Sequence, residues 1–235
     1  MQSAAKMRVM PTRREFIAVS AALLLRPQAR TGRINTLLGT GAPSENANNP
    51  FGLVIGPDRG LYWADFGGHR VMRFEFGTKA VSVIAGTGKA GYTGDGGPAN
   101  QAQLNAPHEV RFDTKGNVYV AERDNHVVRY IDMKSKTIST AAGTGMRGFS
   151  GDGGPANQAQ LAQPHSIALD RADNVYICDI MNNRVRRIDP KTGMISTFAG
   201  SGERGNTPDE AGLDGTPVAG PRSIEIAPDG TMPHN

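Results

Sequence analysis

The chain has 235 residues, a net charge of +4, 30 glycines, 15 prolines and only short apolar runs. This length supports one or two domains with a substantial core, and the frequent glycines and prolines argue against a helical bundle and for short strands joined by turns. Residues 1–33 carry a net charge of +6, which leaves about −2 for residues 34–235. The rest of the chain has no Lys/Arg stripe with interleaved aromatic residues, so we expect no nucleic-acid partner.

The N-terminal segment 1–33 combines paired arginines with a short apolar run. Arg13 and Arg14 precede a polar residue, a Phe and an apolar stretch that ends at Leu25. This order resembles the twin-arginine export signal of bacteria, and the run is about half of the roughly 20 residues that span a bilayer. The resemblance implies a periplasmic or secreted protein with no membrane span in the mature chain, or a membrane-tethered one if the signal is not cleaved. The alternative is an ordinary N-terminal helix.

The remaining sequence repeats with a period of 57 residues. Ala85-Gly86-Thr87-Gly88 recurs from Ala142 and, with one change, from Ala199. The segment Gly94 to Leu104 recurs unchanged from Gly151 to Leu161, whereas the linker before the first repeat lacks the Gly-Asp-Gly-Gly-Pro-Ala-Asn insertion. Self-similarity of this length predicts a repeat architecture.

Each repeat predicts four strands separated by turn-forming Gly, Asn and Asp residues. Both faces of the expected second strand are apolar, as in a sheet stacked between neighbouring sheets. Four-stranded units of this length are typical of β-propeller blades, and the alternative, a β-helical solenoid, normally has shorter repeats. In the middle repeat the expected strands are Glu109–Asp113, Val118–Ala121, Val127–Asp132 and Thr137–Ala142.

The best copy of the repeat runs from Pro164 to Asp189 and contains Pro-His-x-Ile, Asn-Val-Tyr and Arg-Val-Arg-x-Ile-Asp. Over residues 34–230 this pattern resembles the NHL-repeat family of β-propellers, and Gly-Asp-Gly-Gly-Pro-Ala resembles the exported bacterial members. The resemblance implies an all-β propeller at 34–235 with complete four-stranded blades at 50–86, 107–143 and 164–200.

Two partial units flank these blades. Residues 34–39 are expected to form only a fourth strand and residues 221–230 only a first strand. Propellers of the family usually have about six blades, which need about 340 residues at this spacing. We therefore expect about three and a half blades of a six-bladed ring, which can self-associate because the ring is incomplete.

Blade topology brings several polar residues to one face, the mouth of the central channel. His108 and His165 occupy the same register in consecutive first strands, and Phe51 and Arg222 occupy it in the flanking repeats. A histidine pair at this place could bind zinc or act in acid–base catalysis. In the NHL family, a propeller lyase that cleaves peptidyl-α-hydroxyglycine holds zinc with histidines from several blades. The alternative is a repeat histidine that forms a local hydrogen bond.

A carboxylate ends the second strand of every repeat, as Asp65, Glu122 and Asp179. These groups could bind calcium or a ligand at the mouth. A carboxylate that recurs in each blade is also explained by a structural role in the following turn. Asp95 and Asp152 are expected to shape the turns of the Gly-Asp-Gly-Gly loops, and Arg129 and Arg186 to be edge or inter-blade salt-bridge partners.

The sequence as a whole predicts a binding or scaffold module for protein, peptide or glycan ligands. The candidate ligand-binding residues are His108, His165, Arg222, Glu122 and Asp179. No residue is assigned a catalytic role and no cofactor is expected, with zinc and calcium left open and His108 and His165 as the candidate metal ligands. The alternative is a metal-dependent lyase or a lactonase-like hydrolase with its site at the channel mouth.

Overall fold

The computed structural model describes residue 37 and residues 47–208, 211–213 and 215–227. The expected export signal at 1–33 lies outside the described residues. The same holds for the expected strand at 34–39, apart from Leu37, and for the last three residues of the expected strand at 221–230.

Three four-stranded antiparallel sheets make up the described part of the chain, one for each repeat. We call them blades one, two and three. Blade one contains β1 (Pro50–Ile55), β2 (Leu61–Asp65), β3 (Arg70–Phe74) and β4 (Val81–Ala85). Blade two contains β5 (Pro107–Phe112), β6 (Val118–Glu122), β7 (Val127–Asp132) and β8 (Thr137–Ala142). Blade three contains β9 (Pro164–Leu169), β10 (Val175–Asp179), β11 (Arg184–Ile188) and β12 (Ile195–Ala199).

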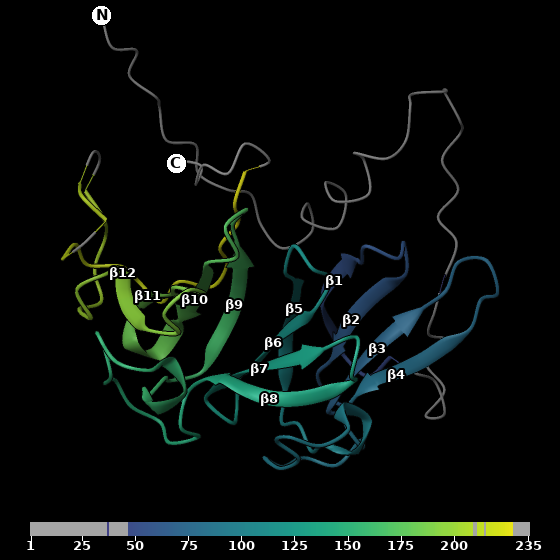
Figure 1. Ribbon diagram of the computed structural model, residues 1–235. Coiled ribbons are helices and arrows are strands. Elements are labelled where there is room, and N and C mark those ends of the chain that lie inside the picture. Colours follow the sequence, from purple (N-terminus) through teal and green to yellow (C-terminus); the bar gives the residue numbers. More distant parts are fainter. Residues whose placement is uncertain (1–36, 38–46, 209–210, 214, 228–235) are drawn as a thin grey trace, which may run out of the picture.

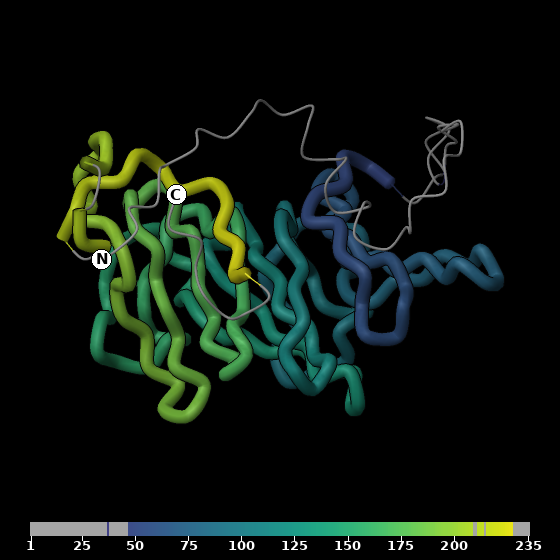
Figure 2. Tube along the Cα trace, turned by 90° about the horizontal axis from the view of Figure 1, so that it is seen from above, coloured from purple at the N-terminus to yellow at the C-terminus, as the bar shows by residue number. Residues whose placement is uncertain are grey.

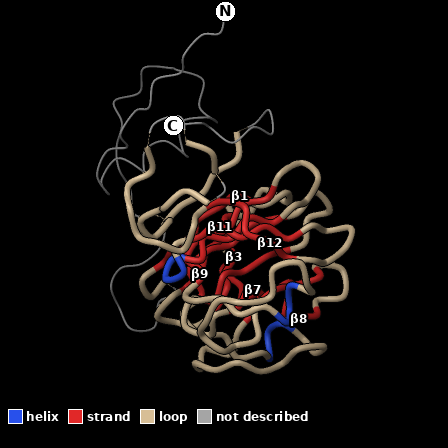
Figure 3. Tube along the Cα trace, turned by 90° about the vertical axis from the view of Figure 1, so that its left-hand side faces the viewer, coloured by secondary structure: helices blue, strands red, loops and turns tan. Residues whose placement is uncertain are grey.

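The all-β prediction and the four strands of each repeat are confirmed. The first strand of blade two begins two residues earlier than expected, because Pro107 pairs with Glu122 across a bulge at the start of β5. The only described helices are single 3-10 turns at Ala99–Gln101, Ala156–Gln158 and Ile180–Asn182, and Figure 3 shows them outside the packed strands.

The blades form an arc with their first strands on its inner side. β1 packs beside β5 and β5 beside β9, whereas β4, β8 and β12 lie on the outer side (Figure 1). Seen from above, the sheets follow one another from blade one at the right to blade three at the left (Figure 2). This is the arrangement of consecutive propeller blades.

Neighbouring blades pack small residues against branched ones. Ala121, Val128 and Ala142 of blade two belong to one core cluster with Ile177 and Ile188 of blade three. The equivalent residues of blade one, Ala64, Val71 and Ala85, pack in the same way against blade two. Because the pairing repeats in register, each blade depends on its neighbour for its core.

The linker that enters each of blades two and three covers the outer edge of that blade. The Gly96 N–H donates to Ile138 O (2.8 Å), the Ile138 N–H donates to Gly97 O (3.0 Å), and the Ala99 N–H donates to Lys136 O (2.9 Å). The same three bonds recur 57 residues later in blade three. The linker therefore satisfies backbone groups that an edge strand would otherwise leave unpaired.

Asp95 fixes this linker to the blade, and does not act on its own turn as the sequence suggested. Its carboxylate accepts hydrogen bonds from Arg129 Nη2 (2.5 Å), from the Thr140 N–H (3.1 Å) and from Thr140 Oγ1 (2.7 Å). Gly94 precedes it with a φ of +94°, and a Cβ there would lie 2.7 Å from the Ala102 Cα. Only glycine allows this close approach without strain.

Residues 221–227 follow blade three at the place where a further first strand was expected. No strand is assigned to them. Ile224 and Ile226 nevertheless pack against Tyr176, Cys178 and Val185 of blade three. The segment therefore covers part of the outward face of blade three without forming regular sheet.

Candidate functional site at the channel mouth

Three rings stand side by side at the starts of the inner strands. His108 is the second residue of β5 and His165 the second residue of β9. Their ring centroids lie 3.6 Å apart, with planes tilted by 42°. Phe51 of β1 stacks on His108 at 4.3 Å and 25°. The structure thus brings together the two histidines that the sequence selected and extends them with Phe51 into what we call the ring column.

The buried position of His108 keeps its imidazole neutral. His108 is only 9% exposed, and its Nδ1 has no hydrogen-bond partner in the described part of the chain. Burial, followed by the nearby positive charges of His165 and Arg123, lowers the pKa of His108 to about 4. At neutral pH this ring is therefore an uncharged group whose Nδ1 is buried without a partner.

His165 is oriented by the next segment of the chain. Its Nδ1 lies 2.9 Å from Arg222 O, and because a carbonyl can only accept, Nδ1 is the donor. Arg222 occupies the register of the two histidines 57 residues later. The structure therefore places the backbone of Arg222 beside the ring column.

A second layer beneath the ring column was not found from the sequence. Glu109 follows His108, and its Oε2 accepts a hydrogen bond from Ser166 Oγ (3.2 Å). Arg111 forms an ion pair with the other oxygen, while burial raises the pKa of Glu109. The residue in this register of blade one is Gly52, and a Cβ there would lie 2.8 Å from the Glu109 Cα. The sequence could have indicated this layer, because Gly52, Glu109 and Ser166 occupy the same register at a spacing of 57 residues.

The two candidate carboxylates, Glu122 and Asp179, do not face the mouth. Both are completely buried. Glu122 accepts hydrogen bonds from the Asn105 N–H (2.8 Å), Asn125 Nδ2 (2.6 Å) and Arg129 Nη1 (3.0 Å). Burial raises the pKa of Glu122 to about 7, against the lowering effect of these donors. Neither side chain reaches a surface where a ligand could bind, because its oxygens are used inside the blade.

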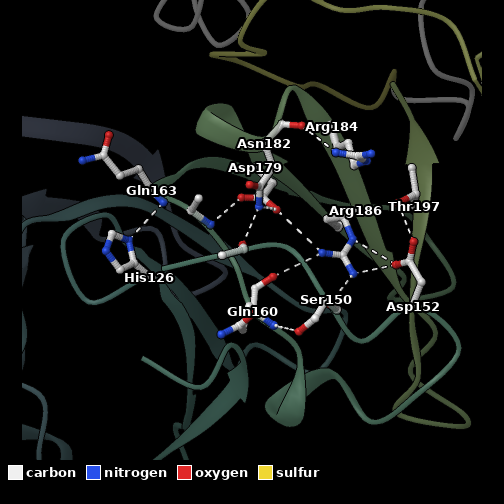
Figure 4. A network of polar contacts seen from close by, with 12 residues as sticks. His126, Ser150, Asp152, Gln160, Gln163, Asp179, Asn182, Arg184, Arg186 and Thr197 are labelled. Atoms are coloured by element: carbon white, nitrogen blue, oxygen red, sulfur yellow. Dashed lines mark hydrogen bonds and ion pairs between the residues drawn. The ribbon is translucent and has the colours of Figure 1, made fainter. Parts of the chain in front are cut away.

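Asp179 is held by the same arrangement in blade three (Figure 4). It accepts from the Ala162 N–H (2.6 Å) and from Asn182 Nδ2 (2.7 Å), and Arg186 Nη1 lies 3.7 Å away. Burial raises its pKa to about 6. Arg186 Nη2 also donates to Asp152 Oδ1 (2.6 Å). The other oxygen of Asp152, Oδ2, accepts a hydrogen bond from Thr197 Oγ1 (2.6 Å). Arg186 was expected as an edge or inter-blade salt-bridge partner; it forms an ion pair with Asp152, and its side chain is completely buried between these carboxylates.

Blade one also contains a buried carboxylate, but different residues surround it. Met72 occupies the register of Arg129 and Arg186, and it lies in an apolar cluster with Trp63 and Phe74. Arg70, two residues earlier, donates to Asp65 instead (2.8 Å). The buried carboxylate is thus retained, while its arginine partner comes from a different position on β3.

His69 and His126 join consecutive blades. His69 Nδ1 accepts a hydrogen bond from the Ala106 N–H (3.2 Å), and His126 Nδ1 accepts one from the Gln163 N–H (3.1 Å). In the next repeat Asn183 Oδ1 accepts from the Gly220 N–H (3.1 Å). The backbone of all three residues lies in the left-handed region, with φ between 49° and 57°. These histidines are therefore structural acceptors between blades and not ligands of the mouth.

The described residues contain no group of three or more His, Cys, Asp or Glu side chains that could hold a metal ion. His108 and His165 alone would supply two ligands to the zinc that the sequence left open, and a zinc site needs at least three from the protein. The carboxylates considered for calcium are buried and already hydrogen bonded. Within the described residues, no helix is long and apolar enough to cross a membrane.

Comparisons with known proteins address the family. No family model matches the chain. It is 27% identical over 179 residues to human NHL repeat-containing protein 2, covering 67% of this chain and 24% of that protein. It is also 27% identical over 170 residues to the chloroplastic protein SUPPRESSOR OF QUENCHING 1 of Arabidopsis thaliana, covering 69% of this chain and 16% of that protein. Together with the repeated four-stranded blades, these relatives support an NHL-repeat β-propeller.

A solved structure supports the propeller fold. This chain superimposes on an auxiliary nutrient binding protein from Bacteroides ovatus with a TM-score of 0.58 and 16% identity, and the match covers 77% of this chain and 44% of that one. At this identity the likeness concerns the fold alone. The chain spans a quarter or less of the length of the two curated relatives.

Proposed function

We propose that this NHL-repeat chain is an exported binding module that holds a glycan, peptide or protein ligand at the channel mouth. The ring column carries the proposal. Phe51, His108 and His165 present flat, closely spaced rings at the starts of three successive inner strands. Flat rings in this arrangement suit the apolar face of a sugar or a flat side chain of a peptide.

The other polar residues support binding over catalysis. Glu122 and Asp179 recur in register and are bound inside their blades, as are Arg129 and Arg186. A solved structure with the same fold is called an auxiliary nutrient binding protein, which makes a nutrient glycan or peptide a reasonable first ligand class. Export by a twin-arginine signal in residues 1–33 is part of this proposal.

A screen of the full chain against neutral glycans and peptides tests the function, followed by titration of the best ligand. Replacing His108 and His165 together by Ala should weaken its affinity by about tenfold or more, because two of the three rings that form the contact surface are lost. His126→Asn is the matched control, since Asn183 performs the same structural task in the next repeat. Unchanged affinity in the double variant, or the absence of any ligand, would overturn the proposal.

A lactonase-like hydrolase or a lyase is the second candidate, and the state of His108 favours it. His108 is neutral at neutral pH, with a pKa of about 4, and lies against His165, and a neutral imidazole is a proton acceptor. If so, turnover of a lactone panel by the full chain should disappear in His108→Phe, the residue found in this register in blade one. Turnover that survives in His108→Phe would exclude this role.

A further inference from the structure

A cavity of about 210 Å³ lies at the end of blade three, beside the ring column. Ile180 and Met181 of the turn between β10 and β11 form one wall. Gly220 and Arg222 of the segment that follows blade three form another, and Arg204 enters from the linker after β12. No function described above uses this cavity.

The frame of the cavity is fixed by Asn183. Its Oδ1 accepts from the Gly220 N–H (3.1 Å) and its Nδ2 donates to Gly202 O (3.2 Å). One side chain thus ties the turn of blade three to both segments that supply the arginines. The distance between the walls is therefore set by the fold before any ligand arrives.

The two arginines give the cavity a positive charge. Arg204 and Arg222 are exposed, and no ion pair joins either of them to another residue in the described ranges. None of the described lining residues is acidic. Arg129 and Arg186 differ, since both are buried in ion pairs with carboxylates. Two guanidinium groups beside one partly open pocket are suited to an anion.

The preceding blade junction provides an internal comparison. The residues 57 positions before Met181 and Arg222 are Asp124 and His165. Asp124 forms an ion pair with Arg123 at 3.1 Å, so that the earlier junction carries its own counter-charge. At the end of blade three Ile180 and Met181 replace both members of this pair, and the histidine is replaced by Arg222. The ion pair of the earlier junction is therefore absent at this cavity, and a permanent cation is added.

We propose that this cavity binds an oxyanion, a carboxylate, sulfate or phosphate, on a small ligand whose carbon skeleton contacts Ile180 and Met181. Arginine forms paired hydrogen bonds with the oxygens of such groups, and the two apolar side chains suit a short carbon frame. The proposal rests on the proposed binding function, because Arg222 is also the residue whose carbonyl orients His165. It refines the ligand class to an acidic sugar or another small organic anion.

Calorimetric titration of the full chain at constant ionic strength tests this site with glucose, glucuronate, glucose 6-sulfate and glucose 6-phosphate. At least one anionic sugar should bind about tenfold or more tightly than glucose, and the three anions show which oxyanion is preferred. Arg204→Gln and Arg222→Gln should each remove most of this preference. Arg147→Gln is the matched control, since Arg147 is the exposed residue 57 positions before Arg204 and should change affinity less than twofold.

The outcomes separate this proposal from the proposed function. Equal binding of glucose and all three anions, or no binding of any of them, overturns the anion site. An equal loss in Arg147→Gln and Arg204→Gln also overturns it, because the effect would then be general electrostatic attraction. Anion binding that persists when His108 and His165 are both Ala, but disappears in Arg222→Gln, supports the anion site and counts against the ring column. The reverse pattern supports the ring column alone.

Discussion

Replacing Arg129 by Met tests the buried ionic network of blade two, since Met72 occupies the same register in blade one. The Arg129 side chain is completely buried between Glu122, also completely buried, and Asp95, whose side chain is 45% exposed. The pair with the exposed Asp95 contributes little, about 0–1 kcal/mol. Removing one partner of a fully buried pair costs about 3–5 kcal/mol, because the remaining charge stays buried. We therefore expect Arg129→Met to lower the free energy of unfolding by about that amount at pH 8.

The same reasoning predicts a rescue and a dependence on pH. Adding Glu122→Gln removes the buried charge, so the double variant should recover more than half of the loss. Burial raises the pKa of Glu122 in the folded protein from 4.5 to about 7, so this group favours folding below pH 4.5 and loses that contribution as the pH rises through 7. Without Arg129 the carboxyl binds its proton more strongly still. The deficit of Arg129→Met should therefore be smaller at pH 5 than at pH 8.

Urea unfolding of the full chain, followed by circular dichroism, measures these differences. Arg187→Met is the matched control, because Arg187 is half-buried and donates to the neutral Asn174 Oδ1 at 3.0 Å. It should cost about 1 kcal/mol. The reasoning is refuted if Arg129→Met costs no more than Arg187→Met, or if the double variant is less stable than the single one.

Three further predictions use comparisons that the repeat supplies. His126→Ala should lower the free energy of unfolding by about 1–2 kcal/mol at pH 8, whereas His126→Asn should lower it by less than half as much in the same urea experiment. In wild type, the neutral state of His108 should stabilise the fold fully above pH 6.5 and lose this effect as the pH falls towards 4, and His108→Phe should remove that dependence, with the pKa itself followed by NMR titration. Gly94→Ala should be more destabilising than Gly96→Ala in thermal unfolding, because both have positive φ but only Gly94 would place its Cβ within 4 Å of other atoms, at 2.7 Å from Ala102; equal losses would contradict the steric argument.

The blades could be predicted because each repeat of the sequence forms the same four-stranded sheet. The 57-residue period, the turn residues and the two apolar faces of each second strand specify four strands, and β7 and β8 have the predicted bounds. The early start of β5 was missed because the pairing of Pro107 with Glu122 depends on a bulge. A bulge is set by the partner strand as much as by the local sequence.

The candidate site was predicted only in part, for a physical reason. Register alone placed His108 and His165 together, and the structure shows adjacent rings. Register also placed Glu122 and Asp179 near the mouth, but a strand end does not determine whether a side chain points outward or into the blade. Their burial depends on arginines seven residues away in sequence, at Arg129 and Arg186. Such pairs become visible only when the strands are folded against each other.

The position of the Gly-Asp-Gly-Gly loop changes where one structural unit of this protein begins. Residues 94–99 precede β5 in sequence, yet they bond to β8, the last strand of the same blade. A peptide cut at Pro107 and Ala142 would contain all four strands but expose the outer edge of β8 and leave Arg129 without Asp95. A peptide cut at Gly86 would keep both contacts. The smallest transferable piece is therefore a linker with the blade that follows it, and exchange of blades between proteins should respect that boundary.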